Sequence, residues 1–218
     1  MKRIITLLLA LGILATAQPA AVAQLTDEMK ADGWVSIFNG TTLEGWKSNE
    51  TYEGFKVENG TIVGFGGRNH LYYMGEAYKN FELKIDVKIN NDGNSGVYVK
   101  SQWQDAAWPT TGFELQVNSS HRDHLRTGTL YGIVQILEAP HKDDEWFTYH
   151  IICRGNELVV HVNEKHLYTY VDQRTGPPAT PITDGNKRIA QTGHIALQQH
   201  HQGSVVEFKN IFVKKLPD

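Results

Sequence analysis

Polar side chains that could bind or transform a sugar alternate with apolar residues in two stretches of this sequence. The alternation places Glu114, Gln116 and Asn118 on one face of an expected strand, and it places Gln198 and His200 together on another. Carboxylate, amide and imidazole groups can bind sugar hydroxyls, and the carboxylate and the imidazole can also move protons. Two solvated sheet faces would give the same pattern. The alternation alone therefore leaves a functional site and an ordinary surface equally open.

A third expected strand, within residues 93–100, ends on two more polar side chains. Tyr98 and Lys100 share the face opposite to the valines of this strand. If that face joins Glu114 and His200, the site combines an acid or base, an imidazole and a cation. Such a combination suits proton transfer on a sugar.

Two connecting segments carry weaker signals. Trp103 and Trp108 lie in the long connection 102–112, where they either stack on sugar rings or cap the core. The segment 121–124 has the sequence His-Arg-Asp-His, whose spacing could ligate a metal only if the loop folds favourably. A solvated loop is the simpler interpretation of that segment.

The number of carboxylates on the first strand bears on the reaction. The common retaining glycosidase mechanism needs two carboxylates about 5 Å apart, one as acid and one as nucleophile. Sandwich glucanases supply both from alternate positions of one strand, but here those positions are Glu114, Gln116 and Asn118. Only one carboxylate is present, so this strand does not support ordinary double displacement.

The elements that must position these residues are short strands. Period-two alternation is cleanest in 81–89, where every odd-numbered residue is apolar, and this predicts a half-buried antiparallel strand. Asn59-Gly60 is a favoured hairpin turn. Residues 26–32 are expected to form one helical turn, and further strands are expected at 55–57, 61–63, 158–162, 166–171 and 205–213. Together these features predict an all-β antiparallel sandwich or jelly roll with few or no helices.

The ends and the composition add the cellular context. A basic start, a short apolar run and Ala21-Val22-Ala23 predict a cleavable signal peptide over 1–23, which leaves 24–218 as one exported domain, periplasmic or extracellular. Loss of Lys2 and Arg3 changes the formal charge from −3 to −5, and the remaining basic residues are scattered. A nucleic-acid partner is therefore disfavoured, and no membrane span is expected after cleavage. Cys153 is the only cysteine, so it should be a buried thiol outside any internal disulfide.

A set of motifs in a fixed order carries a family resemblance over nearly all of the mature chain. The motifs are WVSIFNG at 34–40, LEGW at 43–46, NSGVYVK at 94–100, GFELQV at 112–117, GTLY at 128–131, GHIALQ at 193–198 and FKNI at 208–211. In this order the chain resembles the 3-keto-disaccharide hydrolase domain family, formerly a domain of unknown function, with a concanavalin A-like jelly-roll fold. The resemblance implies a periplasmic enzyme acting on glycosides oxidised to a ketone at sugar carbon 3. Lys100 and Asn118 depart from the common pattern, which puts the substrate and a metal site in doubt.

The resemblance gives the single carboxylate a chemical purpose. A ketone at C3 acidifies the proton on C2, so a base can form an enolate that expels the aglycone from C1, after which water adds to the enone. In this hypothesis Glu114 or His200 is the base or binds a divalent metal ion, and Lys100 stabilises the enolate. The residues expected to bind the carbohydrate are Gln116, Gln198, Tyr131, Trp103 and Tyr98.

Two other functions fit the same pattern. A non-catalytic, lectin-like carbohydrate-binding module would use the same face, with Trp103 and Trp108 as stacking platforms. A structural module of a surface assembly would neither bind a glycan nor form product. Product formation from a 3-keto-glycoside separates the enzyme from both alternatives.

Overall fold

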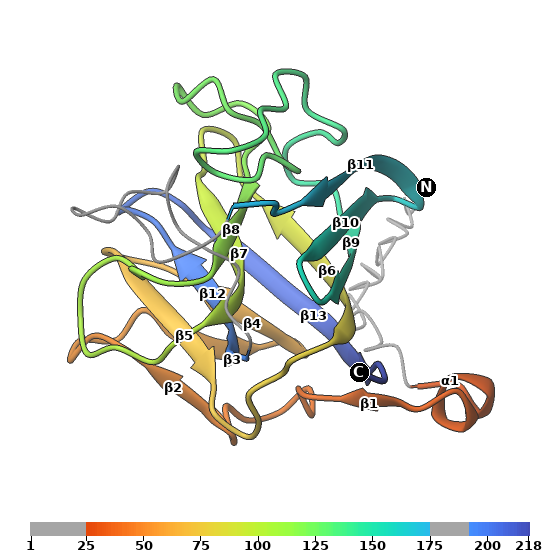
Figure 1. The fold of residues 1–218 in the computed structure, drawn as a ribbon. Coiled ribbons are helices and arrows are strands. Elements are labelled where there is room, and N and C mark those ends of the chain that lie inside the picture. Colours follow the sequence, from red (N-terminus) through yellow and green to blue (C-terminus); the bar gives the residue numbers. More distant parts are fainter. Residues whose placement is uncertain (1–24, 175–191) are drawn as a thin grey trace, which may run out of the picture.

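The computed structural model describes residues 25–174 and 192–218 (Figure 1). The predicted signal peptide and most of the connection 172–191 lie outside these residues. Within them, strands dominate and one short helix, α1, precedes the first strand. The elements are α1 Asp27–Ala31, β1 Trp34–Ser36, β2 Trp46–Ser48, β3 Phe55–Glu58, β4 Thr61–Gly64, β5 Asn69–Tyr73, β6 Phe81–Ile89, β7 Ser95–Ser101, β8 Phe113–Val117, β9 Phe147–Arg154, β10 Glu157–Val162, β11 Lys165–Val171, β12 His194–Gln199 and β13 Val206–Lys215.

The strands form two antiparallel sheets that pack face to face (Figure 1). The larger sheet has the order β11-β10-β9-β6-β13-β4-β3, with β1 added against β13. The smaller sheet has the order β2-β5-β12-β7-β8. This is the predicted all-β sandwich, and its two sheets bury one apolar cluster between them.

Local patterns placed most of the elements correctly. The strand predicted at 81–89 is β6 with the same bounds. The hairpin turn predicted at Asn59-Gly60 joins β3 to β4, and both of its residues have positive φ, 50° and 78°. The expected helical turn is α1, which the Thr26 side chain caps by accepting a hydrogen bond from the Met29 amide.

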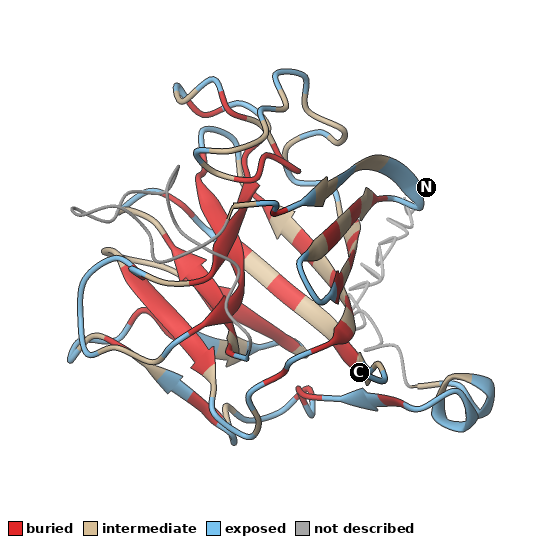
Figure 2. Cartoon of the chain, viewed as in Figure 1, coloured by how far each residue is buried: buried red, intermediate tan, exposed pale blue. Residues whose placement is uncertain are grey.

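Burial differs between the two sheets (Figure 2). In β6 and β9 buried residues alternate with half-buried ones, as expected for a sheet with one wet face. Every residue of β7 and β8 is buried, and so are the last five residues of β12. Cys153 is fully buried in the apolar cluster, as predicted, and burial raises the pKa of its thiol to about 12. The smaller sheet is therefore covered on both faces.

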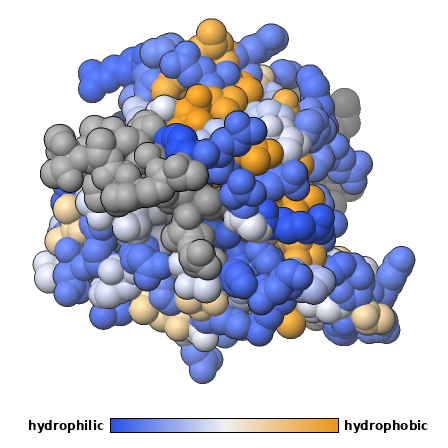
Figure 3. Space-filling view, in the orientation of Figure 1, coloured by the Kyte–Doolittle hydropathy of each residue, from blue (hydrophilic) through white to orange (hydrophobic). Residues whose placement is uncertain are grey.

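The surface is largely hydrophilic. On the face seen in Figure 3, apolar side chains form small groups among hydrophilic ones. None of the helices in the described parts of the chain is long and apolar enough to cross a membrane.

Candidate active site

The candidate site is built on the outer face of the smaller sheet, where β12, β7 and β8 run side by side. Their register pairs Ala196 with Tyr98 and Tyr98 with Glu114, so these residues form one row across the sheet. In the next row Gly96 pairs with Gln116. The alternation read from the sequence thus brings Glu114, Gln116 and Tyr98 together.

Glu114 is buried in this face, with only 8% of the residue exposed. The Tyr98 hydroxyl donates to its Oε2 at 2.7 Å, and the Gln198 amide donates to its Oε1 at 2.8 Å. Hydrogen bonds to both oxygens fix the orientation of the carboxylate. Gly96 makes room for it, since a Cβ added there would lie 2.4 Å from Glu114 Oε1.

Above this row lies a cavity of about 240 Å³. Its volume is below the roughly 300–1,000 Å³ of pockets for drug-sized ligands, which suits one sugar ring rather than a long chain. The residues that line it are Asn94, Tyr98, Trp108, Pro109, Glu114, Gln116, Asp123, Tyr131, Gln198 and His200. Six of the eight residues predicted from the sequence are among them, and Lys100 and Trp103 are not.

His200 brings an imidazole to the cavity. Burial lowers the pKa of His200 to about 4, with further contributions from the neighbouring His201 and His121. Its Nδ1 lies 3.1 Å from His201 Nδ1, and its ring centroid lies 5.1 Å from that of Trp108. The imidazole is therefore neutral at pH 7 and can accept a proton.

A second carboxylate, which the strand pattern missed, enters from the loop after β8. Asp123 lines the cavity and accepts a hydrogen bond from the Tyr131 hydroxyl at 3.4 Å. Asn118 positions this loop: its Nδ2 donates to the backbone oxygens of Asp123 and Leu125, and its Oδ1 accepts from the His121 amide. The segment interpreted as a solvated loop is thus tied to the sheet. Its only sequence signal was the cluster of ionisable residues at 121–124.

Of the two tryptophans, Trp108 and not Trp103 reaches the cavity. The ring of Trp103 packs edge-on against Tyr72 at 5.1 Å, and Lys47 Nζ lies 4.1 Å from its centroid. Trp108 stays 40% exposed at the cavity, with the Arg68 guanidinium carbon 5.6 Å from its ring centroid. Trp103 extends the packing of the sheet beside the cavity and is not among the residues that line it, so its contact with a sugar stays a prediction.

Lys100 also lies elsewhere than the alternation predicts. Its side chain is 1% exposed, and its Nζ donates to the Gly155 backbone oxygen of the larger sheet at 3.3 Å. The pairing of β7 with β12 shifts between Tyr98 and Ser101, and Lys100 has a φ of 55°, which marks a β-bulge. The extra residue turns Lys100 inward, so the expected cation is absent from the residues that line the cavity.

A divalent metal ion held by Glu114 and His200 was a further prediction. Both residues line the cavity, but both oxygens of Glu114 already accept hydrogen bonds. Within residues 25–174 and 192–218, no group of three or more His, Cys, Asp or Glu side chains is arranged to hold a metal ion. Metal binding stays a prediction.

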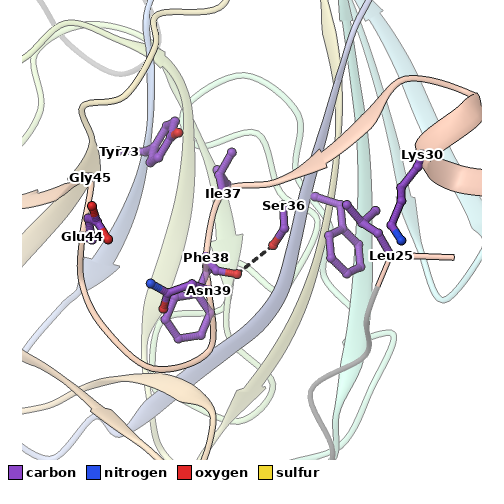
Figure 4. A pocket seen from close by; sticks show the side chains of 10 residues that line it. Leu25, Lys30, Ser36, Ile37, Phe38, Asn39, Glu44, Gly45 and Tyr73 are labelled. Carbon is purple, nitrogen blue, oxygen red and sulfur yellow. Dashed lines mark hydrogen bonds between the residues drawn. The ribbon is translucent and has the colours of Figure 1, made fainter. Parts of the chain in front are cut away.

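A larger hollow of about 550 Å³ lies elsewhere, near α1 and β1 (Figure 4). Leu25, Ile37 and Phe38 line it together with Lys30 and the Ser36 hydroxyl, which donates to the Phe38 backbone oxygen at 2.7 Å. It is open, and the Ser36 and Asn39 side chains in it hydrogen-bond to the backbone rather than hold a reactive group in place. Size alone therefore does not identify the site.

Comparisons with known proteins agree with this architecture. The chain is 27% identical to a 3-keto-disaccharide hydrolase of Bacteroides thetaiotaomicron over 85% of this chain and 79% of that protein. A Parabacteroides distasonis protein provisionally described as a glycosyl hydrolase has 26% identity and a TM-score of 0.76, covering 90% of this chain and all of the other. The carbohydrate-binding module CBM66 of Bacillus subtilis shares the fold at 11% identity, with a TM-score of 0.54 over 78% of this chain and 96% of the module. The model of the 3-keto-α-glucoside-1,2-lyase-like domain matches residues 33–214, and the chain belongs to this family.

Proposed function

We propose that this protein cleaves the glycosidic bond of 3-keto-glycosides by elimination and hydration. The observation that carries the proposal is the carboxylate of Glu114, which Tyr98 and Gln198 hold in the sheet at a cavity of one-sugar size. Membership of the lyase-like family supports the same substrate class. A carboxylate fixed in place before substrate arrives is suited to removing one defined proton.

The proposed reaction balances without an oxidant or a reductant. A base takes the proton from C2, and the electron pair of that C–H bond moves towards the C3 carbonyl to give an enolate. When the C3 carbonyl re-forms, C1 and C2 become doubly bonded and the aglycone oxygen leaves C1 with a proton. Water then adds at C1 and C2 regains a proton, so the net reaction is hydrolysis.

The residues divide the proton transfers by their chemistry. Glu114 is the proposed base, because its carboxylate is ionisable and oriented. The Tyr131 phenol lines the same cavity, 3.4 Å from Asp123 Oδ2, and can turn its single O–H to the leaving oxygen. His200, neutral at pH 7 because burial lowers its pKa to about 4, can accept the proton of the attacking water.

The test follows C2 in D₂O by NMR, using a 3-keto-glucoside and its unoxidised glucoside with the same aglycone. The expected result is release of the aglycone from the 3-keto substrate only, with deuterium at C2 or a detectable enone. Cleavage of the 3-keto-glucoside without either signal would contradict elimination. Retention of sugar without any product would favour the lectin-like module.

A second candidate function rests on Asp123. Two carboxylates, Glu114 and Asp123, line the cavity, and two carboxylates are what an ordinary glycosidase needs. This candidate predicts turnover of the unoxidised glucoside and its loss in Asp123→Asn. The elimination proposal predicts no turnover of that substrate.

We also propose that the enzyme works outside the inner membrane after cleavage before Gln24. Mass spectrometry of the protein recovered from the periplasm or the medium should give an N-terminus at residue 24. Recovery of a full-length chain from the cytoplasm would contradict export.

A further inference from the structure

Three buried polar atoms at the cavity have no hydrogen-bond partner among the described residues. They are Gln116 Nε2, Gln198 Oε1 and Asn94 Oδ1, and all three residues line the cavity. Each of these residues is at most 2% exposed. A buried polar atom without a partner destabilises the fold, so three at one cavity indicate groups that a ligand completes.

For Gln198 and Asn94, the hydrogen bond made by the amide nitrogen shows that the amide oxygen faces the ligand. The Gln198 Nε2 donates to the Glu114 carboxylate at 2.8 Å, which leaves its Oε1 as the free acceptor. The Asn94 Nδ2 faces His121 Nδ1 at 3.3 Å, and that nitrogen already accepts from the Asp123 amide at 3.1 Å. A nitrogen that accepts hydrogen bonds must meet the amino group of Asn94, so Asn94 turns its oxygen towards the ligand.

Gln116 supplies the unpaired donor, and its position relates it to Glu114. The two residues are two apart on β8 and share its outer face, which places their Cα atoms roughly 7 Å apart. Gly96 lies opposite Gln116, and the space above this glycine holds the Glu114 carboxylate rather than a β7 side chain. A sugar whose C2 proton meets Glu114 can therefore direct the oxygen on the adjacent carbon, C3, at Gln116.

The free donor and the two free acceptors fit different oxygens of a 3-keto sugar. A ketone oxygen only accepts hydrogen bonds, whereas a hydroxyl both donates and accepts. Gln116 Nε2 can therefore serve a ketone, and the oxygens of Gln198 and Asn94 require hydroxyl donors. We infer that Gln116 donates to the C3 ketone oxygen, where negative charge develops, while Gln198 and Asn94 accept from neighbouring hydroxyls.

This inference rests on the proposed function. It assigns the stabilisation of the enolate charge to a neutral amide rather than to a cation. As C2 loses its proton, negative charge develops on the C3 oxygen, and a donor already in place stabilises it without reorganisation. Removing one such donor from a comparable site costs about 10²- to 10³-fold in kcat. Lys100, the residue expected to do this, is turned towards Gly155.

The test uses Gln116→Glu, which keeps the shape but replaces the donor with an acceptor, and Gln116→Met, which removes hydrogen bonding altogether. Gln135→Glu on an exposed loop makes the same charge change as a control. Each protein is measured for kcat/KM with a 3-keto-glucoside and for inhibition by the unoxidised glucoside. We expect both Gln116 variants to lose about 10²- to 10³-fold in kcat/KM, with the inhibition constant unchanged or lower in Gln116→Glu.

The inhibition constant also reports whether the variants are folded. Equal losses of turnover and of inhibitor binding, or full turnover by both variants, would overturn the inference. If the wild-type protein cleaves no 3-keto-glucoside, the proposed function fails. The inference is then decided by calorimetry: it is supported if Gln116→Glu weakens binding of the 3-keto ligand but not of the unoxidised glucoside, and it is rejected if the two affinities change equally or not at all.

Discussion

The outer faces of the two sheets carry polar residues at the same spacing, yet their surroundings differ. On the larger sheet these residues stay half-buried and pair with one another, as Lys88 does with Glu207 at 2.8 Å and Thr148 with Asp86 at 2.6 Å. On the smaller sheet Gln116 and Gln198 are 1% exposed and keep atoms without a partner in the described chain. Among the described residues a single such atom, His161 Nδ1, also occurs on the larger sheet, so it is the gathering of several of them around one cavity that marks the binding face.

The largest expected effect comes from the carboxylate that distinguishes the two faces. Glu114→Gln keeps the shape of the side chain but removes its ability to take a proton, which should lower kcat on a 3-keto-glucoside by about 10²- to 10⁴-fold. Glu207→Gln, on the outer face of the larger sheet, should leave turnover unchanged and alter stability by at most about 1 kcal/mol. Steady-state kinetics and urea unfolding of both variants measure this contrast. Equal turnover in the two variants would remove Glu114 from the chemistry.

A smaller loss is expected from the glycine beneath the carboxylate. The Cβ of Gly96→Ala would lie 2.4 Å from Glu114 Oε1, so the carboxylate must move. A displacement of about 1 Å can cost about 10²-fold in rate. Gly67→Ala is the control, because its Cβ would make an ordinary contact of 3.5 Å with Tyr52. Wild-type kcat in Gly96→Ala would show that the orientation of Glu114 does not limit the reaction.

The covered histidine predicts a dependence of stability on pH. His200 titrates at about 4 in the folded protein, below its ordinary 6.5, because burial and the charges of His201, His121 and Arg122 outweigh the opposing effect of Asp123. Between these values the unfolded chain binds a proton that the folded chain does not, so the free energy of unfolding falls as pH falls from 6.5 to about 4.

Urea unfolding across this range should show a weaker fall in His200→Gln than in the wild type. His166→Gln on β11, an exposed histidine of the larger sheet, is the matched control and should retain the wild-type slope. Identical slopes in all three proteins would place His200 in water rather than under the loops.

The smallest effect on activity is expected at Lys100. Lys100→Met should leave turnover unchanged, because the amine contacts Gly155 in the turn between β9 and β10 and not the cavity. Burial lowers the pKa of Lys100 in the folded state, so the unfolded state binds more protons and wild-type stability should rise as pH increases towards 10.5. This rise should be smaller in Lys100→Met. Loss of turnover in a stably folded Lys100→Met variant would show that the Lys100 amine takes part in the reaction.

The sequence predicts the face of a residue where the strand alternation is unbroken, and it fails where a bulge interrupts the strand. Glu114, Gln116 and Gln198 follow an unbroken alternation, which fixes the face of each side chain. Lys100 comes after the same kind of alternation, but the bulge adds one residue and reverses the face. A bulge set by pairing with a distant strand leaves no local pattern.

Loop residues escaped prediction for another reason. Asp123 reaches the cavity because Asn118 and its hydrogen bonds fold the loop back over β8. Trp108 and Trp103 lie in one connection, and only the path of that loop decides which of them lines the site. Periodicity describes strands, so the residues that cover a sheet have to be found from tertiary contacts.

The most direct test is a crystal structure of Glu114→Gln soaked with a 3-keto-glucoside. The sugar should lie on the outer face of the smaller sheet, with its C2 facing residue 114 and its ketone oxygen within hydrogen-bond distance of Gln116 Nε2. A sugar bound instead in the larger hollow beside α1, or on the outer face of the larger sheet, would contradict the assignment of the covered polar face as the active site.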